Sequence, residues 1–260
     1  MNSFNNRGFQ GKKIIVTGAS KGLGASISKV LASKGAKLAL LARSKQKMDN
    51  LKKNFYNSKD HISIKLDLSK NNQIKPAINK AKNFLKNIDI VIHVAGGGFG
   101  FKNPLLSNNE LQTLFQVNLG AAAEINRIII SSKDKNSELK LIHVGSIASV
   151  EAVGSVGYNI AKSALLAYVK SLGREYYKYN IIVTGILPGG FIAKGNSMER
   201  FKKKNLKDYK KFIKTRLPRR KMGHVDEIIP VILFLCSNYS SMMGGSLVPI
   251  DGGESKSYFY

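Results

Sequence analysis

The chain has 260 residues, a hydrophobic content of 43% and a formal net charge of +26 at pH 7. This length suits one large α/β domain, and the apolar fraction is ample for a sizeable core. The excess of Lys is scattered among many Asn and Ile without a recognisable nucleic-acid module, so it argues against a nucleic-acid partner. No apolar run reaches the ~18 residues of a membrane span. The first ten residues lack the apolar core of a secretory signal, and Cys236 is the single cysteine. We therefore expect a cytoplasmic protein that does not contact a membrane.

The first predicted elements are a strand at residues 12–16, a glycine-rich turn and a helix at residues 25–34. The turn places Gly18, Gly22 and Gly24 in the pattern G-x-x-x-G-x-G, a variant of the dinucleotide fingerprint. In such a turn the first glycine permits the tight bend, the second lets the backbone approach a phosphate, and the third lets helix pack on strand. The pattern predicts a nucleotide cofactor.

The second predicted strand, residues 36–42, ends in Arg43. An acidic residue at this strand end would accept hydrogen bonds from an adenosine ribose, and none is present. Arg43 and Lys21 instead offer two cations for a 2′-phosphate. We therefore expect NADP(H) to be preferred, with NAD(H) as the alternative.

Strands and helices continue to alternate through the rest of the chain. Further strands are predicted at residues 62–66, 88–94, 139–144, 181–187 and 245–250, and further helices at residues 46–57, 74–85, 110–127, 159–178 and 226–235. This alternation predicts a single-domain α/β Rossmann fold over residues 1–260, with a doubly wound, seven-stranded parallel sheet.

A Tyr and a Lys follow the fifth strand at helical spacing. Tyr158 and Lys162 are one helical turn apart, and a nearby ammonium would lower the pKa of the Tyr hydroxyl and make it a usable proton donor. The pair alone is a weak signal. Ser146, however, closes the fifth strand twelve residues before Tyr158. Both side chains can therefore reach the crevice at the carboxyl ends of the strands, where Ser146 would hydrogen-bond a substrate oxygen.

Together these motifs resemble the short-chain dehydrogenase/reductase family over nearly the whole chain, residues 12–253. The motifs that carry the resemblance are Thr17-Gly18-Ala19-Ser20-Lys21-Gly22-Leu23-Gly24, Asp67-Leu68, Ala95-Gly96, Asn118, Ser146, Tyr158 with Lys162, and Pro188-Gly189. The resemblance implies hydride transfer between NAD(P) and a ketone or secondary alcohol. It also implies a catalytic tetrad of Asn118, Ser146, Tyr158 and Lys162, in which the Asn bends its helix and holds a water.

The resemblance further implies a set of cofactor contacts, with Asp67 and Leu68 touching the adenine. The full set is Gly18, Ser20, Lys21, Gly22, Leu23, Gly24, Arg43, Asp67, Leu68, Ala95, Gly96, Tyr158, Lys162, Pro188, Gly189 and Phe191. Two positions depart from the family pattern: His93 replaces an Asn, as a structural substitute hydrogen-bonded within the sheet, and Ala193 replaces a Thr that meets the nicotinamide amide. The remaining histidines are scattered, so no metal site is expected.

The last feature is a cation-rich stretch at about residues 191–221, which the resemblance identifies as a substrate lid and which we call the basic segment. It either attracts an anionic small-molecule or carrier-bound substrate or is simply solvated. Two substrate classes fit: a 3-oxoacyl group on acyl carrier protein, or a phosphorylated or nucleotide-linked sugar, as in reductases of surface-polysaccharide pathways.

A class without enzymatic activity, a cofactor-sensing protein, would usually lose Tyr158 or Lys162. If the basic segment is helical, Lys203, Lys207 and Lys211 would share one face. Apolar positions on more than one face of the helices at residues 110–127 and 159–178 predict a homo-oligomer, a tetramer or a dimer.

Overall fold

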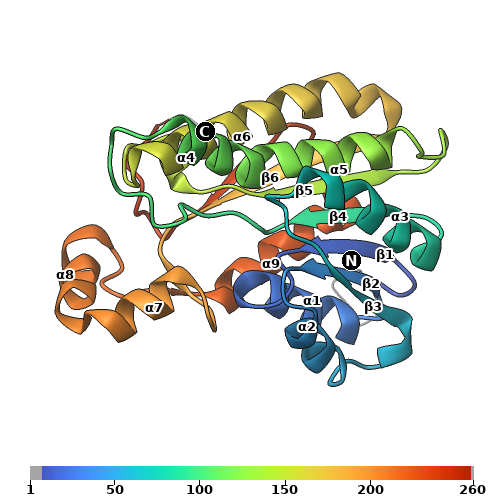
Figure 1. Ribbon diagram of the computed structural model, residues 1–260, viewed down its shortest axis with the longest axis horizontal. Helices are drawn as coiled ribbons and strands as arrows, with labels where there is room; N and C mark the ends of the chain where they lie inside the picture. Colours follow the sequence, from blue (N-terminus) through green and yellow to red (C-terminus); the bar gives the residue numbers. More distant parts are fainter. Residues whose placement is uncertain (1–7, 259–260) are drawn as a thin grey trace.

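The computed structural model describes residues 8–258, so most of the stretch read for a secretory signal lies outside the described residues. Its centre is a parallel sheet in the order β3-β2-β1-β4-β5-β6-β9 (Figure 1). The strands are β1 (Lys13–Thr17), β2 (Lys37–Ala42), β3 (His61–Lys65), β4 (Ile90–His93), β5 (Leu139–Val144), β6 (Ile181–Pro188) and β9 (Leu247–Ile250). The predicted seven-stranded, doubly wound sheet is confirmed. The chain reverses its direction of travel across the sheet between β1 and β4, where such folds form their ligand crevice.

Helices cover both faces of this sheet (Figure 1). Successive residues of β1 alternate between two cores: Ile14 and Val16 belong to one and Ile15 to the other. The first core packs α1 (Gly22–Ser33), α2 (Lys45–Lys52) and α9 (Val225–Cys236), and the second packs α3 (Ile74–Leu85), α5 (Ala121–Ile130) and α6 (Val156–Tyr176). Because successive side chains of a strand point to opposite faces, a strand that is apolar throughout contributes side chains to both cores.

The helix predicted at residues 110–127 is not continuous. It consists of α4 (Asn108–Phe115), a π-helical turn at Gln116–Gly120 and α5. The start of α4 is set by a capping box, in which the Ser107 hydroxyl accepts from the Glu110 N–H and the Glu110 carboxylate accepts from the Ser107 N–H. The π turn widens the helix around Asn118, whose Nδ2 donates to the Leu114 carbonyl at 2.9 Å.

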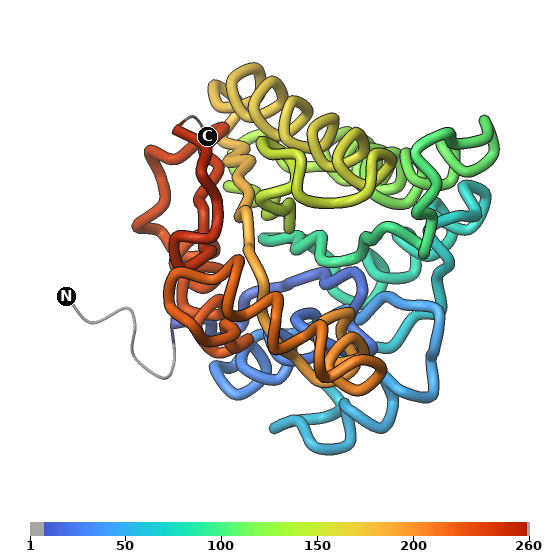
Figure 2. Tube along the Cα trace, turned by 90° about the vertical axis from the view of Figure 1, so that its left-hand side faces the viewer, coloured from blue at the N-terminus to red at the C-terminus, as the bar shows by residue number. Residues whose placement is uncertain are grey.

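The basic segment is mostly helical and stands apart from the sheet (Figure 1), and Figure 2 views the molecule from the side on which it projects. It contains α7 (Ser197–Lys204) and α8 (Leu206–Arg216), and its base is a two-stranded parallel pair of β7 (Phe191–Ile192) and β8 (Gly223–His224). Asn205 ends α7 and caps α8 by accepting from the Asp208 N–H at 3.0 Å.

This break between the two helices corrects one expectation. Lys203 lies on α7, whereas Lys207 and Lys211 lie on α8, so the three do not share one face. Within residues 8–258, no helix is long and apolar enough to cross a bilayer, and no three His, Cys, Asp or Glu side chains gather as metal ligands would.

A buried histidine pair joins β4 and β5 below the carboxyl edge of the sheet. His93 and His143 are register partners and stack with their ring centroids 4.5 Å apart. His93 Nε2 donates to Asn126 Oδ1 at 2.8 Å, and Asn126 Nδ2 donates to the Tyr168 hydroxyl at 3.0 Å and to His143 Nε2 at 3.3 Å. His93 thus has the internal hydrogen bond expected of a structural substitute, although its partner is on α5.

We predict that this pair makes stability depend on pH. Burial lowers the pKa of His93 to about 4 and that of His143 well below its usual value. Both are lower than the unfolded value of ~6.5, so the unfolded chain binds more protons as pH falls through this window, and stability falls with it. His93 alone should contribute a loss of about 2 kcal/mol between pH ~7.5 and ~5.

Urea unfolding at these two pH values would measure that loss. The variant His93→Asn should lose distinctly less stability over the same interval, because one of the two rings that resist protonation is gone. Equal losses in the variant and the unmodified protein would contradict the prediction.

Candidate active site

Ser146, Tyr158 and Lys162 lie together at the carboxyl ends of the strands. Ser146 follows β5, and its hydroxyl lies close enough to that of Tyr158, in the first turn of α6, to act on the pKa of the Tyr. The Lys162 Nζ is 5.8 Å from the centroid of the Tyr158 ring and donates to the Val144 carbonyl at 2.9 Å. The spacing of these residues in the sequence therefore brings three side chains to one place, as expected.

The electrostatics of this group differ from the expectation. Lys162 was expected to lower the pKa of Tyr158. Burial instead raises that pKa, and the Ser146 hydroxyl acts in the opposite direction. The physical reason is that the Lys162 ammonium is directed at a backbone carbonyl, and burial lowers its own pKa to about 8. Tyr158 therefore holds its proton at neutral pH, and Lys162 exchanges its proton close to neutral pH.

Asn118 fixes the backbone strip Ala95–Gly97, which leaves β4 toward this group. Its Oδ1 accepts from the Gly97 N–H at 2.9 Å, and its Nδ2 donates to the Gly97 carbonyl at 3.0 Å. A Cβ on Gly96 would lie 2.7 Å from the Asn118 Oδ1 and 3.1 Å from the Lys162 Nζ. Only a glycine allows both side chains to approach the strip this closely, and the fourth member of the predicted tetrad thereby joins the other three.

The glycine turn lies against the other side of the same strip. A Cβ on Gly18 would meet the Ala95 nitrogen at 3.0 Å, and one on Gly24 would lie 2.3 Å from the Gly18 carbonyl oxygen. Gly18 and Gly22 also have positive φ angles of 69° and 59°. The Gly22 N–H, which was expected to face a phosphate, donates to the Lys194 carbonyl at 2.8 Å. No side chain caps the N-terminus of α1, which suits the phosphates of a dinucleotide.

Four cations gather beside this turn. Lys21, before α1, and Arg43, after β2, were expected from the sequence. The structure adds Lys47 on α2 and Arg200 on α7. The pKa of Lys21 is lowered, first by burial and then by repulsion from Arg200, Lys47 and Arg43, in that order. The set fits a strongly anionic group such as a phosphate.

Asp67 and Leu68, which were expected to meet the adenine, follow β3. Asp67 Oδ1 accepts from the N–H and the hydroxyl of Ser69, at 3.0 and 2.8 Å. Gln116, in the π turn, donates from its Nε2 to the Leu68 carbonyl at 3.1 Å. The turn that carries Asn118 therefore also holds the loop expected to meet the adenine, a connection that sequence spacing alone does not reveal.

At the opposite end, a carboxylate that sequence reasoning missed fixes the turn after β6. Glu254 Oε2 accepts from the Gly190 N–H at 2.6 Å, and a Cβ on Gly189 would lie 2.7 Å from the same oxygen. Burial raises the pKa of Glu254, while the hydrogen bond from Gly190 opposes this. Ala193 is buried in the apolar core, so it supplies no hydroxyl where the family has Thr. Phe191 opens β7 directly after the turn.

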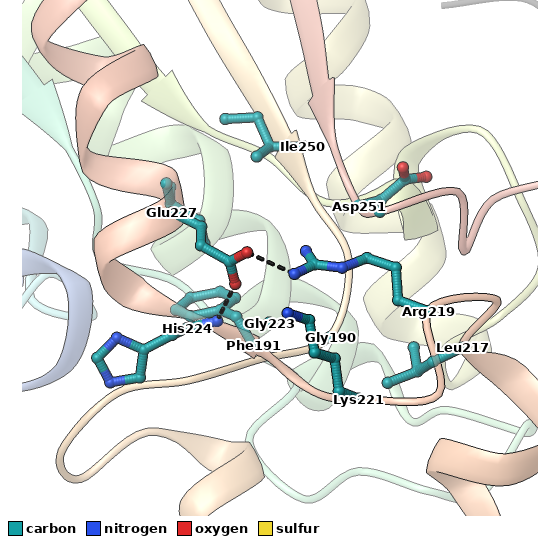
Figure 3. A pocket seen from close by; sticks show the side chains of 12 residues that line it. Gly190, Phe191, Leu217, Arg219, Lys221, Gly223, His224, Glu227, Ile250 and Asp251 are labelled. Carbon is teal, nitrogen blue, oxygen red and sulfur yellow. Dashed lines mark hydrogen bonds and ion pairs between the residues drawn. The ribbon is translucent and has the colours of Figure 1, made fainter.

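A cavity of about 40 Å³ lies behind Gly190, between the base of the basic segment, α9 and the end of β9. Arg219 and Glu227 point toward one another across it and form an ion pair at 2.5 Å (Figure 3). A space of this size holds about one water molecule. This cavity therefore belongs to the packing of the segment's base, and the substrate must bind elsewhere.

Comparison with known proteins agrees with this geometry. The family model for short chain dehydrogenase matches residues 12–205. A 3-oxoacyl-acyl-carrier-protein reductase of Buchnera aphidicola is 30% identical over 247 residues, which cover 93% of this chain and 97% of that protein. A 2-dehydro-3-deoxy-D-gluconate 5-dehydrogenase of Formosa agariphila is 28% identical over 249 residues, covering 94% and 92% of the two chains.

Solved structures show the same fold. L-sorbose reductase from Gluconobacter frateurii, complexed with NADPH and L-sorbose, has a TM-score of 0.86 at 23% identity and covers 97% of this chain and 100% of its own. Levodione reductase also has a TM-score of 0.86, at 25% identity, and covers 96% and 100% of the two chains. The chain therefore belongs to the short-chain dehydrogenase/reductase family and is a nicotinamide-dependent oxidoreductase.

Proposed function

We propose that the protein is an NADP(H)-dependent reductase that interconverts a ketone and a secondary alcohol. The observation that carries this proposal is the placement of the Ser146 and Tyr158 hydroxyls beside the buried Lys162, whose Nζ donates to the Val144 carbonyl. The bound cofactor supplies the hydride for the carbonyl carbon. Tyr158 donates its hydroxyl proton to the substrate oxygen, and the Ser146 hydroxyl hydrogen-bonds the same oxygen and orients it.

The two pKa shifts give these residues complementary tasks. The raised pKa of Tyr158 keeps its proton in place until negative charge develops on the substrate oxygen. The pKa of Lys162, near 8, allows this side chain to give up a proton to Tyr158 and to be reprotonated at neutral pH. Asn118 keeps the strip beside Lys162 in position through its two bonds to Gly97.

The preference for NADP(H) over NAD(H) is supported by the cations around Lys21 and Arg43 and by the lack of a carboxylate at the end of β2. Two structural neighbours are described with this type of cofactor: the Gluconobacter reductase with NADPH and a short chain dehydrogenase of Burkholderia cenocepacia with NADP.

For the substrate we propose an anionic or carrier-bound ketone, first of all a 3-oxoacyl group on acyl carrier protein. Several relatives have this activity in their names, including the Buchnera protein and one from Aquifex aeolicus. The exposed cations of α8 offer a surface for an acidic carrier. A sugar with a phosphate or nucleotide group is the second candidate, since the Formosa and Gluconobacter relatives are named for sugar-derived substrates.

A cofactor-binding protein without catalytic activity is the contrasting class, and the presence of all four tetrad residues in one place argues against it. A homo-oligomer stays a prediction. An open groove lined by Leu111, Phe115 and Leu119, on α4 and the π turn, gives it an apolar face to use.

The first test removes only the proton donor. Tyr158→Phe should reduce turnover ~10²–10⁴-fold, because the ring stays and its hydroxyl is lost. NADPH binding, followed by fluorescence titration, should change little. If this variant kept most of the unmodified rate on the same ketone, Tyr158 would not be the proton donor.

The second test concerns the charge of the basic segment. Attraction between α8 and an anionic substrate is screened over ~8–10 Å at ordinary salt, so salt should lower kcat/KM and leave kcat nearly unchanged. A small neutral ketone should show no such dependence. Reversing Lys207, Lys211 and Lys214, which share one face of α8, to Glu should lower kcat/KM for the charged substrate alone.

A control with the same change in net charge reverses the exposed Lys75, Lys80 and Lys135, away from this segment. If both triple variants behaved alike, the effect would be one of overall charge, and the cations of α8 would only be solvated.

A further inference from the structure

The basic segment touches the glycine turn through its own backbone. The Lys194 carbonyl accepts from the Gly22 N–H at 2.8 Å. A Cβ placed on Gly195 would lie 3.4 Å from the Lys21 side chain, and the Gly195 carbonyl accepts from the Arg200 Nη1 at 2.5 Å. Lys21 and Arg200 are therefore held against the same short stretch of backbone, although one belongs to the first βα turn and the other to α7.

These two cations and their neighbours form no ion pair among the described residues, and Asp67 acts on the group only at longer range, through its attraction to Arg43. Within residues 8–258 no ion pair involves Lys21, Arg43, Lys47 or Arg200, whereas nearby lysines are neutralised: Lys45 pairs with Asp49, and Lys203 with Glu199. The carboxylate closest to Arg200 in the sequence is that of Glu199. It already pairs with Lys203 and also accepts a hydrogen bond from the Gly195 N–H at 2.7 Å. Repulsion among these like charges contributes to the lowered pKa of Lys21, after the larger effect of burial. A bound anion would remove this penalty.

Arg200 is well placed to bind such an anion. It is exposed, and one of its guanidinium nitrogens is occupied by the Gly195 carbonyl, which fixes the direction of the side chain. The remaining N–H groups of a guanidinium can donate two parallel hydrogen bonds to a phosphate. The charge, the fixed direction and the lack of a carboxylate partner together fit a phosphate dianion.

We propose that Arg200 is a specificity residue on the basic segment that binds the adenosine 2′-phosphate together with Lys21 and Arg43. The inference rests on the proposed use of NADP(H) and extends it: the same phosphate is bound by Lys21 and Arg43, at the end of the sheet, and by Arg200 on α7. Because binding and conformation are linked reciprocally, the phosphate stabilises α7 against the glycine turn, and the docked α7 strengthens phosphate binding. NADPH, but not NADH, should therefore order the segment that covers the substrate.

The experiment uses the full chain and two probes, 2′,5′-ADP and 5′-AMP, which differ in the 2′-phosphate. Binding is measured by titration calorimetry, and the exposure of α7 by hydrogen exchange of its amides. The unmodified protein should bind 2′,5′-ADP much more tightly than 5′-AMP and should protect α7 only with 2′,5′-ADP. Arg200→Gln should weaken 2′,5′-ADP binding roughly 10–100-fold, as expected for loss of a charged hydrogen-bonding partner, leave 5′-AMP binding unchanged, and abolish the protection.

Two further variants separate the possible failures. Lys204→Gln removes an exposed cation from the same helix and should change neither affinity. Arg43→Asp should weaken 2′,5′-ADP binding and reverse the preference between NADPH and NADH.

If Arg43→Asp did so while Arg200→Gln kept its affinity for 2′,5′-ADP, the role of Arg200 would be wrong and NADP(H) use would stand. Equal losses for both probes in Arg200→Gln would overturn the assignment to the 2′-phosphate. An unmodified protein that bound the two probes equally would overturn both the inference and the cofactor preference.

Discussion

The site depends on the close approach of the Asn118 and Lys162 side chains to the backbone of Gly96 and Gly97, which carry no side chains. Asn118 binds both the N–H and the carbonyl of Gly97, and Gly96 leaves room for the Asn118 amide and the Lys162 ammonium. Asn118 itself lies in the π turn, where its Nδ2 also donates to the Leu114 carbonyl. Tyr158, in the first turn of α6, lies beside the next residue of this backbone, since a Cβ on Gly98 would be 3.5 Å from the Tyr158 Cβ.

Burial then sets the chemistry of the residues around this strip. Lys162 lacks a carboxylate partner within the described residues and donates only to the Val144 carbonyl, and burial lowers its pKa to about 8. Tyr158 shifts in the other direction for the same reason, since burial always disfavours the charged form. The neutral Tyr158 can therefore act as the proton donor, and Lys162, which readily exchanges its proton, can resupply it. The Ser146 hydroxyl adds a directional contact.

Much of this could be predicted from the sequence, because the signals are local. Apolar runs that alternate with helical patterns determine a parallel sheet, and Gly24 is required by its contact with the Gly18 carbonyl within the same turn. The break at Asn205 was missed because it depends on a side-chain cap within a stretch that has good helix formers on both sides of it. Glu254 was missed because it binds Gly190, 64 positions away along the chain. Arg200 was missed because it acts on Lys21, which belongs to another element. Neither contact can be read from a periodic pattern in the sequence.

The most direct test of the central claim adds a single methyl group to the strip. Gly96→Ala would force the Asn118 amide and the Lys162 ammonium away, whereas the new methyl of Gly98→Ala would lie 3.5 Å from the Tyr158 Cβ and 3.7 Å from its ring, which are ordinary contact distances. A displacement of this kind is expected to lower kcat by ~10²-fold, measured as NADPH oxidation with a ketone that the unmodified protein reduces. Gly98→Ala should remain within a few-fold of the unmodified rate. If Gly96→Ala retained a kcat as high as that of Gly98→Ala, the close approach of Asn118 and Lys162 would not be what organises the site.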